Sequence, residues 1–452
     1  MSRVVRRVAA AGALLVVAPA GCSETGPQVG VSGSTTSTTA RPGAVIATAG
    51  DGHSVVSMFA GAHWFGGTVP PKPTPTDPSA TPIKIGVMSA DNGAIAALPE
   101  LHQGIDAAIS WINDELGGVD GHPLVEVFCE VDISPEKSQL CARKMVDEHV
   151  VAVMSGVDLA AGDAIKILNE NDIAWVGGIP IGDAEMQSVN TFQFSGGTPG
   201  AFVAFAQHAA TQLEAKRVSI MYLNIAQVKG PAITYGVGLL KQLGIEVNEV
   251  SFDLTTQDYA AVAQKAAEGN PDAIIVGAAD FACPKVMQAI VDLHSTATVY
   301  LVGSCADRKW LDQVGAEHAA GFVFNIEGRI DQSVSNSADT EMYRVVLARY
   351  QPETTAAGAA TVSFRGMMNL WSVLQQVGPG GTSRDVIAAF RASKDRASFD
   401  GHPYTCDGKQ IAALPGLCAP QEVLAKVAAD GTFSETSDGW IDVPAIAADH
   451  HL

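Results

Sequence analysis

From residue 83 onward, short runs of β-branched and other apolar residues alternate with amphipathic stretches. Ile105, Ile109 and Ile112 recur at helical spacing between the first two runs. Continuous apolar runs separated by helices are typical of parallel sheets that are covered on both faces. The pattern restarts at Val218, and two such series predict an α/β chain with two doubly wound parallel-sheet lobes. The predicted strands are residues 83–88, 124–131, 150–154, 173–176, 218–223, 246–252, 273–277 and 299–302.

The size and charge of the chain argue against several classes of protein. Its 452 residues allow two or three domains at about 150 residues each. A net charge of −20 does not suit a nucleic-acid partner, because phosphate contacts need clustered Lys and Arg. No internal stretch of the sequence reaches the roughly 18 uninterrupted apolar residues of a membrane-spanning helix. We therefore expect neither a nucleic-acid binder nor a polytopic membrane protein.

The first residues have the pattern of an export signal. Three arginines precede an apolar run over residues 8–18, and small residues then lead to Cys22. This order resembles a lipoprotein signal, although the usual Leu three places before the cysteine is Pro19 here. We expect residues 1–21 to be the signal peptide, Cys22 to be the lipidation site, and the protein to be extracytoplasmic and lipid-anchored to the cell membrane. The alternative is a plain secretory signal followed by an unrelated cysteine.

Six further cysteines support export, because an exported chain can keep them oxidised. They allow fifteen connectivities, of which pairing between sequence neighbours is the simplest. Each short loop closed in this way would contribute about 2–4 kcal/mol. A zinc site is the competing interpretation, but the sequence contains no CxxC or HxxxH spacing, so no metal site is expected. The expected pairs are Cys129–Cys141, Cys283–Cys305 and Cys406–Cys418.

Residues 22–81 are predicted to be a tether or linker. The stretch is rich in Gly, Ser, Thr, Pro and Ala, and residues 32–42 offer no side chain for a core. Apolar residues such as Val55 and Trp64 are unusual in a pure linker. Two alternatives stay open, since residues 43–66 either dock on the folded body as a small hairpin or are disordered.

Several motifs between residues 82 and 440 follow one another in the order and spacing of a known family. They are Ile83–Val87, Gly104–Ala108, Trp111–Asn113, Gly117–Pro123, Asp132 with Ser134–Pro135, Val151–Val153, Pro271–Ile274 and Ser398–Gly401. In these motifs the chain resembles the periplasmic substrate-binding proteins of ABC transporters, in the branched-chain amino-acid-binding group with the type I periplasmic-binding-protein fold. Relatives often carry a disulfide at the position of Cys129 and Cys141.

The resemblance implies two lobes joined by a hinge that close over a small-molecule ligand. Residues 82–199 and 327–400 would form lobe 1, and residues 200–326 and 401–445 would form lobe 2. The partners would be the ligand and an ABC permease, with no cofactor. In open parallel sheets ligands bind beyond the carboxyl ends of the strands. The loops at those ends supply the candidate ligand-binding residues Asp91, Asn92, Ser155, Asp158, Gly178, Asn224, Gln227, Asp280 and Phe281.

Two departures from the family pattern argue against an ordinary branched-chain amino acid as ligand. Where relatives show a pair of small hydroxyl residues, this chain has Asp158-Leu159, and a common Tyr-Gly is replaced by Lys229-Gly230. Asp158 and Asp280 could instead face a cationic or hydroxylated ligand, one from each lobe. The alternative is that each caps a following helix.

No motif in the sequence indicates a catalytic site. The sequence has no GxSxG elbow, no P-loop, no HExxH and no GxGxxG. We therefore expect a solute-binding protein that delivers a small polar ligand, an amino acid or a related molecule, to an ABC permease, with no catalytic residue and no enzymatic activity. The alternatives are a surface receptor or sensor, or a structural envelope lipoprotein, with the same two-lobed fold and no transport.

Overall fold

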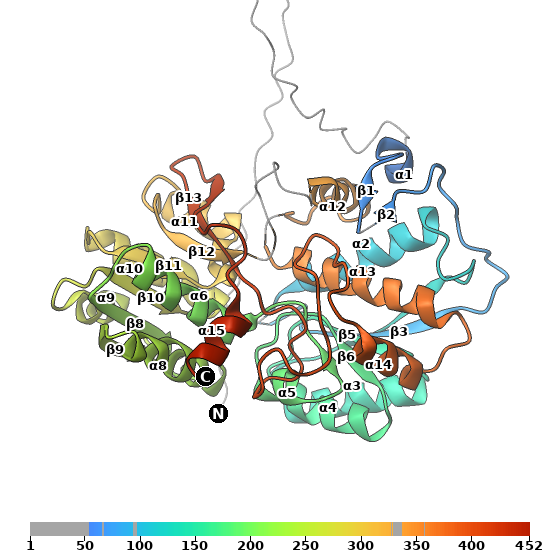
Figure 1. The fold of residues 1–452 in the computed structure, drawn as a ribbon, viewed down its shortest axis with the longest axis horizontal. Helices are drawn as coiled ribbons and strands as arrows, with labels where there is room; N and C mark the ends of the chain where they lie inside the picture. The colour runs from blue at the N-terminus through green and yellow to red at the C-terminus, as the bar shows by residue number, and fades with distance from the viewer. Residues whose placement is uncertain (1–53, 66, 94–96, 327, 329–336, 357) are drawn as a thin grey trace, which may run out of the picture. The chain divides into compact units, whose positions relative to one another are not determined.

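The computed structural model describes residues 54–65, 67–93, 97–326, 328, 337–356 and 358–452 (Figure 1). The expected signal peptide, Cys22 and the tether up to residue 53 lie outside the described residues. Within the described part, no helix has the length and apolar character that crossing a membrane requires.

The first lobe is built on a five-stranded sheet in which every neighbouring pair is parallel. Its order is β4 (Leu124–Glu130), β3 (Ile83–Ser89), β5 (Ala152–Ser155), β6 (Ala174–Val176) and β7 (Thr191–Phe192). The interior strand β3 is buried along nearly its whole length, as a strand covered on both faces must be.

Helices cover both faces of this sheet (Figure 1). Val87 packs in the core on the side of α2 (Pro99–Glu115) and α13 (Ala360–Val377), whereas its neighbour Met88 packs in the core on the side of α3 (Pro135–Asp147) and α4 (Ala161–Glu170). Consecutive side chains of a strand point to opposite faces, so the continuous apolar run of β3 supplies both cores. The remaining helices of this lobe are α5 (Asp183–Gln187), α12 (Ser337–Tyr350) and α14 (Ser383–Ala392).

The second lobe is built on a seven-stranded sheet with a mixed edge. Five parallel strands are joined at one side by two antiparallel strands. The order is β14 (Phe433–Glu435), β13 (Val423–Val427), β12 (Val323–Ile326), β11 (Thr298–Leu301), β10 (Ala273–Gly277), β8 (Arg217–Leu223) and β9 (Glu246–Phe252). The α/β fold with two sheets is confirmed, and the antiparallel edge is the part that the sequence pattern did not predict.

The helices of the second lobe are mostly short. The longest is α6 (Gly197–Thr211), which is buried almost all round because the sheet and neighbouring helices surround it. The others are α7 (Ala226–Pro231), the π-helical turn η1 (Ala232–Val237), α8 (Gly238–Gln242), α9 (Tyr259–Ala267), the 3₁₀ turn η2 (Asp280–Ala282), α10 (Cys283–Asp292), the 3₁₀ turn η3 (Gly303–Ala306), α11 (Arg308–Val314) and α15 (Val443–Asp449).

The described part of the expected tether docks on the first lobe. It forms α1 (Val55–Met58), β1 (His63–Trp64) and β2 (Gly67–Thr68). The buried carboxylate of Glu115 accepts hydrogen bonds from the backbone N–H groups of Val55 at 3.0 Å and Val56 at 2.8 Å, and lies 2.7 Å from a guanidinium nitrogen of Arg349. Residues 54–65 and 67–69, the N-terminal strap, are therefore part of this lobe.

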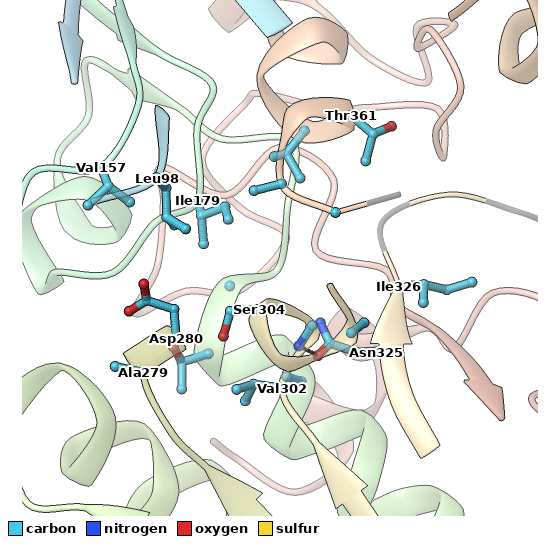
Figure 2. A pocket seen from close by; sticks show the side chains of 18 of the residues that line it. Leu98, Val157, Ile179, Ala279, Asp280, Val302, Ser304, Asn325, Ile326 and Thr361 are labelled. Carbon is cyan, nitrogen blue, oxygen red and sulfur yellow. Dashed lines mark hydrogen bonds between the residues drawn. The ribbon is translucent and has the colours of Figure 1, made fainter. Parts of the chain in front are cut away.

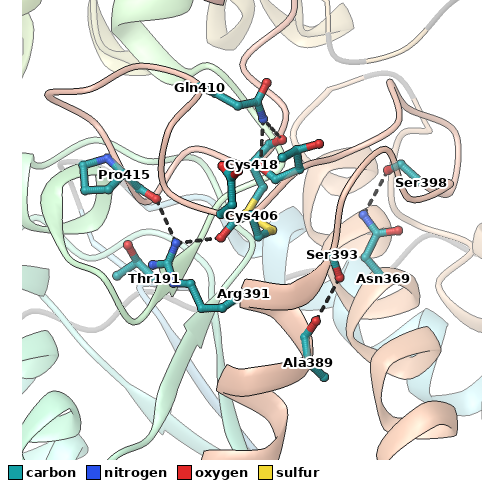
Figure 3. The surroundings of a disulfide bond; sticks show 12 residues. Thr191, Asn369, Ala389, Arg391, Ser393, Ser398, Cys406, Gln410, Pro415 and Cys418 are labelled. Atoms are coloured by element: carbon teal, nitrogen blue, oxygen red, sulfur yellow. Dashed lines mark hydrogen bonds between the residues drawn. A yellow bond between two sulfur atoms is a disulfide. The ribbon is translucent and has the colours of Figure 1, made fainter.

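Three disulfides pair sequence neighbours, Cys129 with Cys141, Cys283 with Cys305 and Cys406 with Cys418, which confirms the expected connectivity. The third lies in a segment shared by both cores, because Tyr404 packs in the first lobe and Leu414 in the second. Arg391 donates hydrogen bonds to the carbonyl oxygens of Cys406 at 2.7 Å and Pro415 at 3.2 Å (Figure 3). The predicted boundary between the lobes at residue 400 stays a prediction, and the shared segment follows it in the chain.

Candidate functional site

A cavity of about 860 Å³ is lined by residues of both lobes, where loops follow the carboxyl ends of the parallel strands (Figure 2). Its wall is mostly apolar. From the loops of the five-stranded sheet it takes only apolar side chains, which are those of Leu98, Ile133, Val157, Leu159, Ile179 and Ile181. Pockets of roughly 300–1,000 Å³ with a few convergent polar groups are the usual form of small-molecule sites.

The second lobe contributes most of the polar groups that the strand-end loops place in the wall. They are Gln227, Asp280, Ser304 and Asn325. Asn325 is already held in place, because its side-chain oxygen accepts the Gly303 N–H at 2.7 Å and its amide nitrogen donates to Glu422 at 3.1 Å. These bonds join the end of β12 to the η3 turn and so fix the position of Ser304 beside it.

Asp280 begins the η2 turn directly after β10, and its carboxylate points across the cavity toward Leu98 and Val157 (Figure 2). Burial raises the pKa of Asp280, while the hydrogen bond from the Phe281 N–H and the charge of Lys309 oppose that rise. A half-buried carboxylate that faces an apolar wall is poorly solvated, so it favours a partner that donates hydrogen bonds or carries positive charge.

Lys309 joins the two lobes through ion pairs near this carboxylate. Its ammonium lies 3.2 Å from a carboxylate oxygen of Asp307 in its own lobe and 3.8 Å from one of Glu100 in α2 of the first lobe. Burial raises the pKa of Glu100, and the charge of Lys309 lowers it. Three carboxyl groups, those of Asp280, Glu100 and Asp307, thus share one ammonium at this end of the cavity.

Of the nine residues that the sequence proposed for ligand contact, three line the cavity, namely Gln227, Asp280 and Phe281. All three come from the second lobe. Of the other six, Ser155 is the last residue of β5 and the remaining five are in the loops where they were expected, but none of the six is among the residues that line the cavity.

Asp158 is the clearest of these differences. Its side chain is 2% exposed and accepts hydrogen bonds from the Ser138 hydroxyl and, at 2.8 Å, from the Ala160 N–H. Burial raises its pKa against these two bonds. The carboxyl group therefore binds a backbone N–H at the start of α4 from inside the lobe, which is close to the helix-capping alternative. Leu159 faces the cavity in its place.

The remaining five residues also have partners or roles within the protein. Asn92 donates to Glu130 at 2.8 Å, and Asn224 donates to Asp253 at 3.0 Å. The buried hydroxyl of Ser155 donates to the Gly156 carbonyl at 3.1 Å. Gly178 has φ +79°, and a Cβ there would lie 2.5 Å from the Ser155 carbonyl oxygen, so the tight turn after β6 requires glycine.

Asp91 belongs to a cluster around His102 on α2. The ring Nδ1 lies 2.5 Å from a carboxylate oxygen of Asp91, and Nε2 lies 2.8 Å from one of Glu126 and 3.7 Å from one of Asp106. Burial disfavours the charged ring, yet the hydrogen bonds to Asp91 and Glu126 raise the pKa of His102 to about 10. His102, Asp106 and Glu126 have the donor set of a small cation site, but an ion-paired imidazolium accounts for the same contacts.

Further lining residues come from helices that the sequence analysis did not single out. Thr198 lies in the first turn of α6, Thr361 in the first turn of α13, and Arg344 in α12. Arg344 is paired with Glu341 at 2.6 Å on the same helix. Thr198 could have been expected from the sequence, because it lies at the start of a helix that follows the passage of the chain from the first lobe to the second. Nothing in the sequence distinguishes Arg344 from other exposed residues of an amphipathic helix.

Comparison with known proteins agrees with this architecture. A protein-family model described as periplasmic binding protein matches residues 82–413. A leucine-binding protein from Thermotoga maritima, 19% identical, superposes with a TM-score of 0.65 over 78% of this chain and 98% of its own. A possible leucine/isoleucine/valine-binding protein from Rhodopirellula baltica, 16% identical, gives a TM-score of 0.67 over 80% of this chain and 98% of its own.

A branched-chain amino-acid transporter binding protein from Streptococcus pneumoniae, solved with isoleucine, is 17% identical with a TM-score of 0.65 over 78% of this chain and 98% of its own. At such identities the likeness is one of fold, that of two α/β lobes. Because the family model spans most of the chain, the chain belongs to the periplasmic binding protein family. The resemblance drawn from the sequence motifs, to the periplasmic substrate-binding proteins, is confirmed, and solved structures of the branched-chain amino-acid group share the fold.

One curated protein also matches part of the sequence. Elongation factor Ts from Burkholderia multivorans is 28% identical over 184 residues, which cover 39% of this chain and 58% of that protein. The chain thus spans less than two thirds of this relative.

Proposed function

We propose that this protein is an extracytoplasmic solute-binding protein that is lipid-anchored at Cys22 and hands a small molecule to an ABC permease. The observation that carries the proposal is the cavity, to which strand-end loops of both sheets contribute. A ligand held by both lobes stabilises their closure, and the closed form gives a permease a shape to recognise. In this function the chain performs no chemistry.

Binding is tested by thermal-shift screening of the purified full chain. The panel includes amino acids, polyamines, amides and small sugars, amino acids being the class named by several solved relatives. A binder at 100 times its dissociation constant adds about 2.7 kcal/mol of apparent stability. A panel in which no compound moves the midpoint contradicts the proposal and favours a structural envelope role.

Anchoring is tested separately by metabolic labelling with a clickable fatty acid in cells that express the full chain. We expect label on the wild-type protein and none on Cys22→Ser, which should appear in the soluble fraction. Delivery is tested by uptake of the ligand found in the screen. Cells that lack this chain should lose most of the uptake, and a strain that retains full uptake would favour a sensor over a transporter component.

A further inference from the structure

The part of the cavity wall that faces the Asp280 carboxylate of the second lobe is apolar and belongs to the first lobe. Leu98, Val157 and Ile179 reach into the space in front of Asp280 (Figure 2). None of these side chains can donate a hydrogen bond to a ligand carboxylate. In this part of the wall such a group would then depend on peptide N–H groups, which at helix starts are the usual anion sites of parallel sheets.

A carboxyl group of the protein itself already lies at the first of these helix starts. Asp158 places one carboxyl oxygen 2.8 Å from the Ala160 N–H at the start of α4 and accepts the Ser138 hydroxyl with the other. Its side chain is 2% exposed, so the carboxyl group stays beneath Val157 and Leu159 rather than in the cavity. A ligand anion would have to displace a buried acidic group from this position.

The second helix start is filled in the same way. A carboxyl oxygen of Glu185 accepts the N–H groups of both Ile181 and Gly182, each at 2.9 Å, in the loop that leads into α5. Glu185 is 1% exposed, and Ile181 is the residue of this loop that faces the cavity. The loops before α4 and α5 thus each already hold a carboxyl group of the chain, which disfavours a second carboxylate beside them.

The charged groups around Asp280 favour a positively charged ligand. Asp280, Glu100 and Asp307 share the single ammonium of Lys309, so the Asp280 end of the cavity has excess negative charge. The other charged residues of the described wall are compensated. Arg344 is paired with Glu341 at 2.6 Å, and the Asp400 carboxylate accepts the Thr340 hydroxyl at 2.7 Å and is near the guanidinium of Arg365.

We propose that the cavity binds an apolar molecule that carries one amine cation and no carboxylate, with the amine at Asp280 and the apolar part against the first lobe. This inference rests on the proposed solute-binding function and names its ligand class. A cavity of about 860 Å³ has room for an aryl or branched alkyl group larger than the side chain of leucine. The branched-chain amino acids themselves are zwitterions, and their carboxylate would meet two loops that already hold carboxyl groups.

The test compares three probes with one skeleton: 2-phenylethylamine, 3-phenylpropionate and phenylalanine. Each is titrated calorimetrically into the purified full chain at pH 7. We expect the amine to bind at least about tenfold more tightly than the acid or the zwitterion, which corresponds to roughly 1.4 kcal/mol. Asp280→Asn should weaken amine binding by about tenfold or more, because it removes the inward charge.

The matched control is Asp292→Asn, which removes an exposed carboxylate at the end of α10 in the same lobe and should leave amine affinity unchanged. Tighter binding of phenylalanine or phenylpropionate overturns the ligand class but leaves the solute-binding function intact, as does a different binder from the wider screen. Equal amine affinity in Asp280→Asn overturns the role of Asp280. If neither these probes nor the wider screen yields a binder, both the ligand class and the proposed function fail.

Discussion

The indole ring of Trp64 packs against that of Trp111, with 5.5 Å between the ring centroids. Trp64 lies in the N-terminal strap, ahead of the residues that match the family model, whereas Trp111 lies in α2 of the first lobe. Trp371 and Phe399 complete the cluster at 6.0 and 6.3 Å from Trp64. The strap therefore covers an aromatic surface of the lobe and is part of its core.

Trp64→Ala should lower the free energy of unfolding by about 3–5 kcal/mol, because it removes a buried indole and leaves a cavity among aromatic rings. Chemical denaturation of the full chain measures this change. His63→Ala is the control, since His63 is exposed on the same strand. Similar losses in the two variants would mean that the strap contributes nothing specific to the lobe.

The alternating pattern of the sequence was sufficient to predict most of the two sheets. The bounds of β9 coincide with the predicted range 246–252, because Gly244 and Asp253 flank this run and such residues terminate strands. The strap was left open for a physical reason. Its docking depends on Glu115 and Trp111, which are distant in sequence, and local composition carries no information on such contacts.

Prediction of the site was limited in the same way. The loops after the strands were correctly expected to reach one cavity, because parallel strands end at one edge of a sheet. Which side chain of a loop faces the cavity was not predictable from the loop alone. Asp158 turns inward because Ser138 of another helix donates to it, and Leu159 then takes the exposed position.

His102 should remain protonated at neutral pH. Both ring nitrogens lie at hydrogen-bond distance from carboxylates, and only an imidazolium can donate from both. Its pKa is raised from 6.5 to about 10, so the stability it contributes is complete below about pH 6.5 and is lost as the pH rises through about 10. Histidine resonances followed by NMR should show no titration of His102 between pH 5 and 8.

His102→Gln identifies the resonance and should lower the thermal midpoint at pH 7, because one neutral amide replaces a cation between acidic groups. The difference between wild type and variant should shrink above about pH 10 as the imidazolium loses its proton. An ordinary midpoint near 6.5 for His102 would contradict the ion-paired assignment. A shift of the resonance on adding Zn²⁺ at neutral pH would instead favour a metal site formed with Asp106 and Glu126.

The Cys283–Cys305 disulfide should hold two segments of the cavity wall together. It joins the start of α10, next to Asp280 and Phe281, to the η3 turn that carries Ser304. Replacing both cysteines by alanine should cost about 3 kcal/mol. It should also speed hydrogen exchange of the amides in residues 279–282 and 303–306.

The matched control for this variant removes the Cys406–Cys418 pair, which closes a segment, residues 406–418, that does not contribute to the cavity wall. A comparable loss of stability is expected there, because that loop is also short. Exchange at residues 279–282 should stay at the wild-type rate. Equal acceleration in both variants would show that the effect on the cavity is global rather than local.

The buried carboxyl group of Glu185 should make the protein less stable as the pH rises. Burial raises its pKa from 4.5 to about 7 despite the hydrogen bonds from Gly182 and Ile181, so the folded state holds a proton that the unfolded state has released. Between those two values stability falls with increasing pH, by about 1–3 kcal/mol for this group, and the penalty is complete above about pH 7. Glu185→Gln keeps an oxygen to accept both N–H groups and removes the titration, so its midpoint should change less than that of wild type between pH 4.5 and 7.5.

Glu170→Gln, on an exposed site at the end of α4, should keep the wild-type slope. Parallel pH profiles for wild type and Glu185→Gln would show that Glu185 is ionised throughout, and hence that the first lobe stabilises a full negative charge at this loop.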